Sequence, residues 1–268
     1  MIAIAHFLAI SLYVGAAVLA ATPFARPVSA PVRGVVALLA AGVTAHACAL
    51  VGVAWVAGQA PLTGLGPALS FAGLVLALAL LLVEATARDV SLTLVAAPLA
   101  AVATTAANLI GLRTLLEPEG VRGAWLVAHI ALSFIGIAAF ATAAAAGAIY
   151  LIERRELKSR RFGAVFRFFP PLETLDRVNH VAAVAGWLGL TLGVVLAVTY
   201  SFAYRAVDLP QIVWGMGAWA AASAVAIGRL VGGWQARRAA LVSSVAFVAV
   251  IALYVAVRVA STGRGQFL

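Results

Sequence analysis

The chain has 268 residues, of which 65% are hydrophobic and only 10% are charged, and its formal net charge is +9. A water-soluble domain carries about 25% charged residues, and this much apolar side chain would leave large exposed apolar patches in water. The composition therefore excludes a soluble enzyme, a disordered chain and a disulfide-stabilised secreted domain. It predicts an all-α, polytopic membrane protein.

Eight stretches are apolar enough to cross a bilayer, which requires about 20 predominantly apolar residues each. In chain order they cover residues 2–22, 34–58, 66–87, 90–112, 123–151, 180–203, 210–231 and 239–258. The first lacks the basic start of a signal peptide and its apolar run is too long for one, so we expect it to be retained. We expect residues 1–268 to form a single integral-membrane bundle of about eight helices.

Most basic residues lie just outside the apolar stretches, as they do where loop charges set the membrane orientation. The longest connection, residues 152–179, holds seven of the 18 Lys and Arg residues and is therefore predicted to be cytoplasmic. Eight alternating spans then place 13 of the 18 on the inner side and both termini outside. This distribution predicts a multi-pass protein of the cytoplasmic membrane, in contact with lipid and not with nucleic acid.

Histidines inside the apolar stretches are the first candidates for function, because ionisable groups are costly at membrane depth. His46 lies near the centre of the second stretch, and His129 lies two turns into the fifth. Each is either a neutral imidazole that bonds a neighbouring helix or a metal ligand, and two such imidazoles form a known ligand set for haem iron. His180, at the inner start of the sixth stretch, is a weaker candidate ligand, and a solvated position is the simpler interpretation. His6 lies at the outer edge of the first stretch.

Other polar and aromatic groups allow two interpretations each. Arg229, near the inner end of the seventh stretch, either reaches the headgroups or pairs with a carboxylate. Trp214 and Trp219, in the outer half of that stretch, belong to an interfacial belt or stack on a flat ligand. Glu84 is expected to pair with Arg88 one helical turn away.

A stripe of small residues follows His129 at helical spacing and permits close approach of another backbone or of a flat ligand. Its members are Ser133, Gly136, Ala143 and Gly147. No phosphate-binding loop, nucleophile elbow or zinc-protease motif occurs, and the single cysteine, Cys48, excludes dithiol chemistry. We therefore expect no independent enzyme.

Four segments, in order along the chain, resemble the integral-membrane cytochrome c assembly family that includes CcsA (ResC) and the HemX-like proteins. They are AHIALSFIGIAAFATAAAAGAIYLIERRELK, FPPLETLDRVNH, GWLGLTLGVV and GGWQARRAALVSSVAF. The resemblance covers about residues 34–258 and is best over 123–258. His129 matches the family's fifth-helix histidine, and His46 falls where related proteins have a second-helix histidine.

The chain departs from CcsA proper in the stretch AVDLPQIVWGMGAW. Pro210, Trp214 and Trp219 keep the family's spacing there, but the Trp-rich run is absent. Arg229 stands where the family has a histidine, and the large outer domain is missing. The resemblance is therefore to the short HemX-like branch.

The resemblance implies a protein that binds b-type haem non-covalently and takes part in cytochrome c biogenesis, as a haem carrier or an assembly accessory. It would be at most a non-catalytic subunit of a haem-attachment system, with other assembly proteins or apocytochrome c as partners. His46 and His129 would ligate the iron, Trp214 and Trp219 would line an outer haem-contact surface, and Arg229 would contact a propionate or a headgroup. The alternatives are a HemX-like regulator of tetrapyrrole synthesis acting through residues 152–179, and a small-solute transporter or structural membrane protein.

Overall fold

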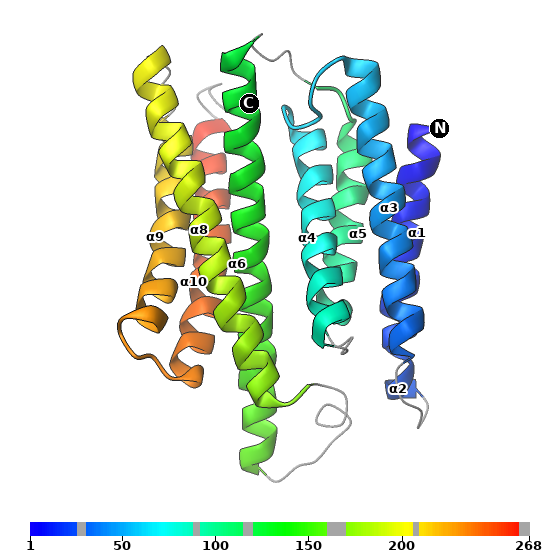
Figure 1. Cartoon of the computed structure of the whole chain (residues 1–268), viewed down its shortest axis with the longest axis vertical. Coiled ribbons are helices and arrows are strands. Elements are labelled where there is room, and N and C mark those ends of the chain that lie inside the picture. Colours follow the sequence, from blue (N-terminus) through cyan, green and yellow to red (C-terminus); the bar gives the residue numbers. More distant parts are fainter. Residues whose placement is uncertain (26–30, 88–91, 115–119, 160–169, 206–208, 263–268) are drawn as a thin grey trace. The chain divides into compact units, whose positions relative to one another are not determined.

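The computed structural model describes residues 1–25, 31–87, 92–114, 120–159, 170–205 and 209–262, and its secondary structure there is entirely helical (Figure 1). Within these residues, eight helices are long and apolar enough to cross a membrane. They are α1 (Ile2–Ala20), α3 (Val32–Ala57), α4 (Leu65–Ala87), α5 (Thr93–Ile110), α6 (Val121–Ser159), α8 (Leu172–Tyr204), α9 (Leu209–Leu230) and α10 (Ala236–Thr262). A short helix, α2 (Thr22–Ala25), follows α1. The prediction of an all-α membrane protein with eight spans is confirmed.

Two helices are longer than their apolar stretches. The fifth stretch was expected to end at residue 151, but α6 continues to Ser159, and α8 begins at Leu172 rather than at residue 180. The added part of α6, about two turns, is rich in Glu, Arg, Leu and Lys, which are good helix formers, so the helix does not end where the hydrophobicity does. Pro171 directly precedes α8, where its missing N–H costs no hydrogen bond. Residues 160–169 of the expected loop lie outside the described residues.

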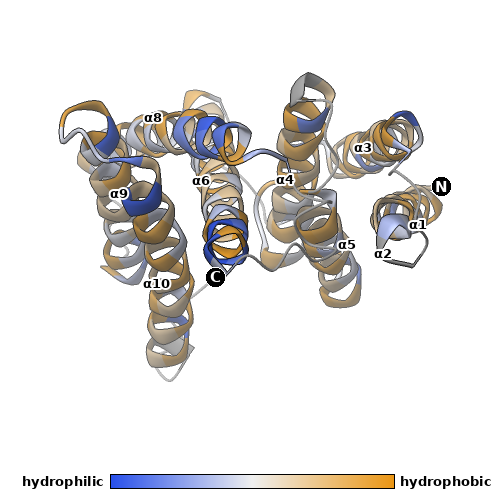
Figure 2. Cartoon of the chain, turned by 90° about the horizontal axis from the view of Figure 1, so that it is seen from below, coloured by the Kyte–Doolittle hydropathy of each residue, from blue (hydrophilic) through white to orange (hydrophobic). Residues whose placement is uncertain are grey.

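The chain divides into two compact units, Met1–Glu117 with Ile152–Thr174, and Pro118–Leu151 with Leu175–Leu268. In the first unit α1 packs against α3 and α5, and α4 packs against α5 and α3 (Figure 1). In the second unit α10 packs against α9. Hydrophobic residues cover most of the helix faces, as a bilayer requires (Figure 2). That residues 1–268 act as one domain stays a prediction.

Small residues on α6 bring neighbouring backbones into contact within the second unit. A Cβ atom added at Gly136 would lie 2.6 Å from the backbone nitrogen of Leu190 in α8. One added at Gly147 would lie 2.8 Å from the carbonyl oxygen of Ala240 in α10. The stripe of small residues that follows His129 therefore accommodates two helix backbones at these glycines, which is the first of its two interpretations.

The contact between α6 and α8 predicts the effect of adding one methyl group. In Gly186→Ala the new Cβ would lie 2.9 Å from the backbone nitrogen of Phe140 and 3.0 Å from the carbonyl oxygen of Gly136, so the helices must separate. We expect a lower thermal unfolding midpoint in detergent. The matched control is Gly215→Ala on α9, which meets nothing within 4 Å and should be neutral or stabilising, since alanine favours helix. Equal midpoints for the two variants would contradict the close packing.

Candidate functional site

Both ring nitrogens of His46 are hydrogen-bonded inside the first unit. Nδ1 lies 3.2 Å from the hydroxyl of Tyr13 on α1, and Nε2 lies 2.9 Å from Oγ of Ser70 on α4. The same Ser70 oxygen lies 2.9 Å from Nε2 of His6, and all four side chains are completely buried. This network, called the histidine–serine network below, joins α1, α3 and α4.

The histidine–serine network contains groups that the sequence did not single out. His6, expected at the outer edge, is fully buried in it, and Tyr13 and Ser70 were not considered. The spacing of His6 and Tyr13, two helical turns apart, already places them on one face of α1. Gly42 lets the tyrosine ring approach α3, since a Cβ there would lie 2.7 Å from its Cε1. To ligate a metal through Nε2, His46 would have to give up its contact with the Ser70 hydroxyl.

His129, in the second unit, forms a hydrogen bond through only one of its two ring nitrogens. Its Nδ1 donates a hydrogen bond of 2.8 Å to the carbonyl oxygen of Gly193 on α8. Because a carbonyl only accepts, Nδ1 carries the proton of the neutral ring and Nε2 carries the lone pair. Nε2 has no hydrogen-bond partner among the described residues, and the ring is partly exposed. The ring of His129 is thus held in one orientation, and its Nε2 lone pair is available to a ligand.

Trp125 and Arg122, one and two turns before His129 on α6, lie against two tyrosines at the end of α8. The Trp125 ring lies edge-on to Tyr200 and Tyr204, with centroid distances of 6.4 and 6.3 Å. The guanidinium of Arg122 donates from Nε to the Tyr200 hydroxyl at 2.8 Å and lies 4.9 Å from the Tyr204 ring centroid. The indole N–H of Trp125 is buried and has no partner among the described residues. None of these residues was among the predicted site residues, although the i, i+4 spacing of Tyr200 and Tyr204 puts them on one helix face.

Trp214 and Trp219 both contact other helices of the second unit. The Trp219 indole donates to Oγ1 of Thr191 on α8 at 3.1 Å, and its ring packs against the buried core of this unit. The Trp214 ring lies 5.4 Å from the Tyr254 ring on α10. Its indole N–H is buried without a partner in the described part of the chain. Trp214 therefore has an unused donor, whereas the donor of Trp219 is satisfied.

Arg229 pairs with a carboxylate of the chain itself. Its Nη2 forms an ion pair with Asp176 on α8 and donates to Oδ1 of Asn179 at 3.1 Å. The side-chain amide of Asn179 in turn donates to the carbonyl oxygen of Ala143 at 2.7 Å and to Oγ of Ser243 at 2.8 Å. The Arg229 side chain is only 8% exposed. This arginine network connects α6, α8, α9 and α10, which makes the pairing interpretation of Arg229 the better description of this structure.

The other two ionisable candidates have simpler surroundings. His180, one turn after Asp176 on α8, is partly buried and makes no hydrogen bond within the described residues. Glu84 accepts hydrogen bonds from the backbone N–H and the hydroxyl of Thr93, which join the end of α4 to the start of α5. Its expected partner, Arg88, lies outside the described residues. No group of three or more His, Cys, Asp or Glu side chains among the described residues is arranged to hold a metal ion.

The arginine network predicts a strong and specific stability effect. Asp176→Ala leaves the buried Arg229 guanidinium without its carboxylate. We expect a loss of about 1–3 kcal/mol in the free energy of unfolding, less than for a fully buried pair because Asp176 is 33% exposed. Adding Arg229→Met to Asp176→Ala should recover part of the lost stability. Adding Arg237→Met, a change at an exposed arginine, should alter it little. Denaturant titration in detergent measures these free energies of unfolding. Strictly additive effects of Asp176→Ala and Arg229→Met would contradict the pairing.

Comparison with known proteins agrees with the sequence pattern. Residues 62–263 match the family described as cytochrome C assembly protein. A cytochrome c biogenesis protein CcsA from Synechococcus sp. (strain CC9605) is 27% identical over 172 residues, covering 55% of this chain and 56% of that protein. The chain thus spans about half the length of this curated relative, and no solved structure matches it significantly. Because the family match covers well over half of the chain, this membrane protein belongs to the cytochrome c assembly protein family.

Proposed function

We propose that this protein binds b-type haem within the membrane and handles it during cytochrome c biogenesis, with His129 as an iron ligand. The observation that carries the proposal is the hydrogen bond from Nδ1 of His129 to the Gly193 carbonyl. A metal-binding imidazole typically donates its second nitrogen to a carbonyl or carboxylate, which fixes the ring and leaves the other nitrogen for the metal. Haem held there supplies the prosthetic group that cytochrome c assembly requires.

The surroundings of His129 suit a flat ring with acidic edges. Trp125, one turn earlier on α6, offers an indole face or its unused N–H. Arg122 is exposed and keeps donors free beyond the one given to Tyr200, so it is available to a carboxylate such as a propionate. This part of the proposal assigns the propionate to Arg122, because Arg229 is already paired with Asp176. Contact of Arg229 with haem stays a prediction.

The remaining site residues take different roles in the proposal. Trp214 offers an unpartnered indole N–H toward a ligand, whereas Trp219 has its donor satisfied by Thr191. His46 becomes a second ligand only where Ser70 releases its Nε2, and His46 and His129 belong to different units. His180, with no hydrogen bond in the described residues, is the weaker ligand at the other end of α8.

The family membership also supports a proposed place in biogenesis. The preferred role is delivery of haem to other assembly proteins or to apocytochrome c. The alternative within the same proposal is an accessory protein that assists assembly. We infer the short HemX-like branch from the arginine at position 229 and from the missing Trp-rich run. The proposed orientation, with both termini outside and residues 152–179 inside, rests on the distribution of basic residues. A regulator of tetrapyrrole synthesis remains the second hypothesis, and it predicts a cytoplasmic partner that requires residues 152–179.

The proposal predicts a specific loss of haem on changing one histidine. Protein produced with ample haem should purify with a Soret absorbance, and His129→Ala should lose most of it, because no other group replaces the oriented donor. The matched variant His180→Ala in the same unit should retain most of the absorbance. A haem-free wild-type protein, or an unchanged Soret band in His129→Ala at equal folded yield, would refute the proposal.

A pair of variants separates the two roles of His46. Ser70→Ala removes a hydrogen-bond partner and leaves Nε2 of His46 free, whereas His46→Ala removes the ring. If His46 only supports the fold, both variants should lower the unfolding midpoint and leave haem per folded protein unchanged. If it ligates iron, only His46→Ala should lose haem or shift the Soret maximum. Absorbance and thermal unfolding in one detergent distinguish these results.

A further inference from the structure

The turn between α9 and α10 folds a tryptophan back onto the end of α9 (Figure 1). The backbone N–H of Gly232 donates to the carbonyl oxygen of Ile227 at 3.0 Å, which closes the end of the helix. Gly233 has a positive φ of 59°, which glycine adopts without steric cost. The backbone N–H of Trp234 then donates to the carbonyl oxygen of Gly228 at 3.0 Å. These contacts fix the position of the tryptophan.

The Trp234 ring contacts both a helix backbone and a guanidinium. A Cβ atom added at Gly228 would lie 2.4 Å from Cδ2 of the ring, and one added at Gly232 would lie 3.3 Å from its Nε1. The indole therefore rests on the backbone at these two glycines. The guanidinium carbon of Arg238 lies over the same ring, 4.4 Å from its centroid. Contact with an indole face holds a guanidinium by cation–π attraction and does not use its N–H groups.

No carboxylate of the described residues pairs with Arg238. The one carboxylate described in the second unit, Asp176, pairs with Arg229. Asp208 directly precedes α9 in the sequence, at the opposite end of this 22-residue helix, which is about 33 Å long. The side chains of Arg238 and its neighbour Arg237 are exposed, and neither forms a hydrogen bond or an ion pair with the described part of the chain. The turn therefore offers positive charge to an anion.

The ends of two spans place this turn at a membrane surface. Helix α9 ends at Leu230 and the span of α10 begins at Ala236, so only residues 231–235 connect two helices that are apolar enough to cross the membrane. Leu230 is 53% exposed and Val231 is 82% exposed. Tryptophan concentrates at the level of lipid headgroups, and exposed aliphatic side chains are favourable where acyl chains cover them. A guanidinium in this turn therefore lies at the level of lipid phosphates.

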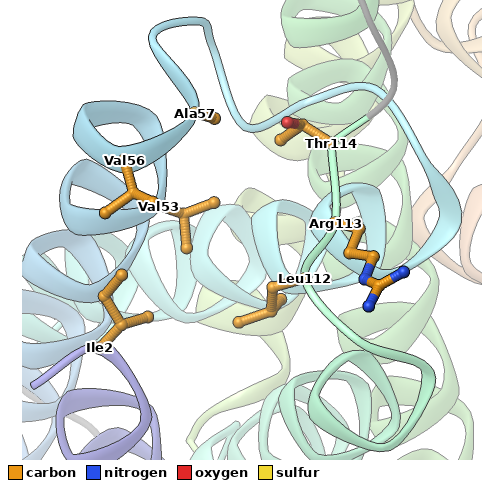
Figure 3. A pocket seen from close by; sticks show the side chains of 7 residues that line it. All are labelled: Ile2, Val53, Val56, Ala57, Leu112, Arg113 and Thr114. Carbon is orange, nitrogen blue, oxygen red and sulfur yellow. The ribbon is translucent and has the colours of Figure 1, made fainter.

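The pocket of the first unit has a different character. Its volume is about 430 Å³, and its aliphatic walls include Ile2, Val53 and Leu112. Figure 3 shows the Arg113 guanidinium pointing away from these walls, on the other side of the segment that follows α5. This pocket therefore presents apolar contacts without a facing charge, whereas the α9–α10 turn presents a held guanidinium beside exposed aliphatic side chains.

We propose that the α9–α10 turn binds the headgroup of one anionic phospholipid, with its phosphate on the Arg238 guanidinium. The guanidinium donates two parallel N–H groups to two phosphate oxygens. Arg237 adds positive charge, and Leu230 and Val231 contact the upper part of an acyl chain. Both arginines lie in the first turn of α10, where the partial positive charge of the helix end makes basic side chains unfavourable. The lipid phosphate offsets this repulsion.

Lipid retention by the full-length protein tests the site. Wild type is reconstituted in nanodiscs with equal amounts of phosphatidylglycerol and phosphatidylcholine and then extracted into detergent, and the retained lipid is measured by native mass spectrometry. We expect preferential retention of one phosphatidylglycerol, and Arg238→Gln should lower this retention about fivefold. The matched control is Arg33→Gln, which removes an exposed arginine from the first turn of another span, α3, and should retain the lipid as wild type does.

A second variant separates the shape of the guanidinium from its charge. Arg238→Lys keeps the positive charge but replaces the planar fork of N–H groups with a single ammonium group. We expect retention between that of wild type and that of Arg238→Gln, because the lysine attracts the phosphate without holding two of its oxygens in one plane. Circular dichroism and the thermal unfolding midpoint verify the fold of each variant.

The proposal fails if the preference for the anionic lipid is absent or depends only on net charge. Equal retention of the two lipids by wild type would overturn it, and so would an equal loss in Arg238→Gln and Arg33→Gln. Full retention in Arg238→Lys would exclude the two-oxygen contact. Displacement of the lipid by an equimolar hexaglutamate peptide would also overturn the proposal, in favour of an acidic protein partner. None of these measurements depends on haem.

Discussion

Hydrogen bonding without water is the constraint on which this structure depends. The hydrocarbon core of a bilayer offers no partner to a buried donor or acceptor, so each polar side chain must find one within the protein. The histidine–serine network meets most of this requirement in the first unit, where Ser70 contacts both His6 and His46, and Nδ1 of His6 has no partner among the described residues. The arginine network does the same in the second unit, where Asn179 contacts three other helices, and Nε of Arg229 has no partner among the described residues. Polar residues thus decide which apolar helices become neighbours.

The same constraint makes polar groups without a hydrogen-bond partner candidates for contact with a ligand. His129 has one nitrogen committed to Gly193 and the other free, and the indole N–H of Trp125 lies one turn away without a described partner. Buried polar groups in native proteins are rarely unsatisfied, so each exception calls for an explanation. The proposed haem-binding role of His129 rests on these two groups and on the nearby Arg122 guanidinium.

The sequence could predict the membrane spans, because hydrophobicity and length decide them. It could not predict which polar side chains pair or form hydrogen bonds with one another. The ends of α6 and α8 were missed, since charged residues end a hydrophobic run without ending a helix. Arg229 was recognised as important, yet its pairing with Asp176 needed the register of α8 and α9. His46 and His129 looked equivalent as sequence, and only the positions of Tyr13, Ser70 and Gly193 distinguish them. A ligand role is thus a property of the neighbours, which single-sequence patterns do not contain.

The sharing of Ser70 has a consequence for the synthesis of the protein. The chain leaves the ribosome from its N-terminus, so α1 and α3 reach the bilayer before α4 exists. Until then His46 has only Tyr13 as a partner, and His6 lacks the hydroxyl that will bond its Nε2. Ser70 then gives Nε2 of His6 and Nε2 of His46 a hydrogen-bond partner at the same time. The hydrogen bonding of the histidine–serine network is therefore complete only when three spans have been synthesised.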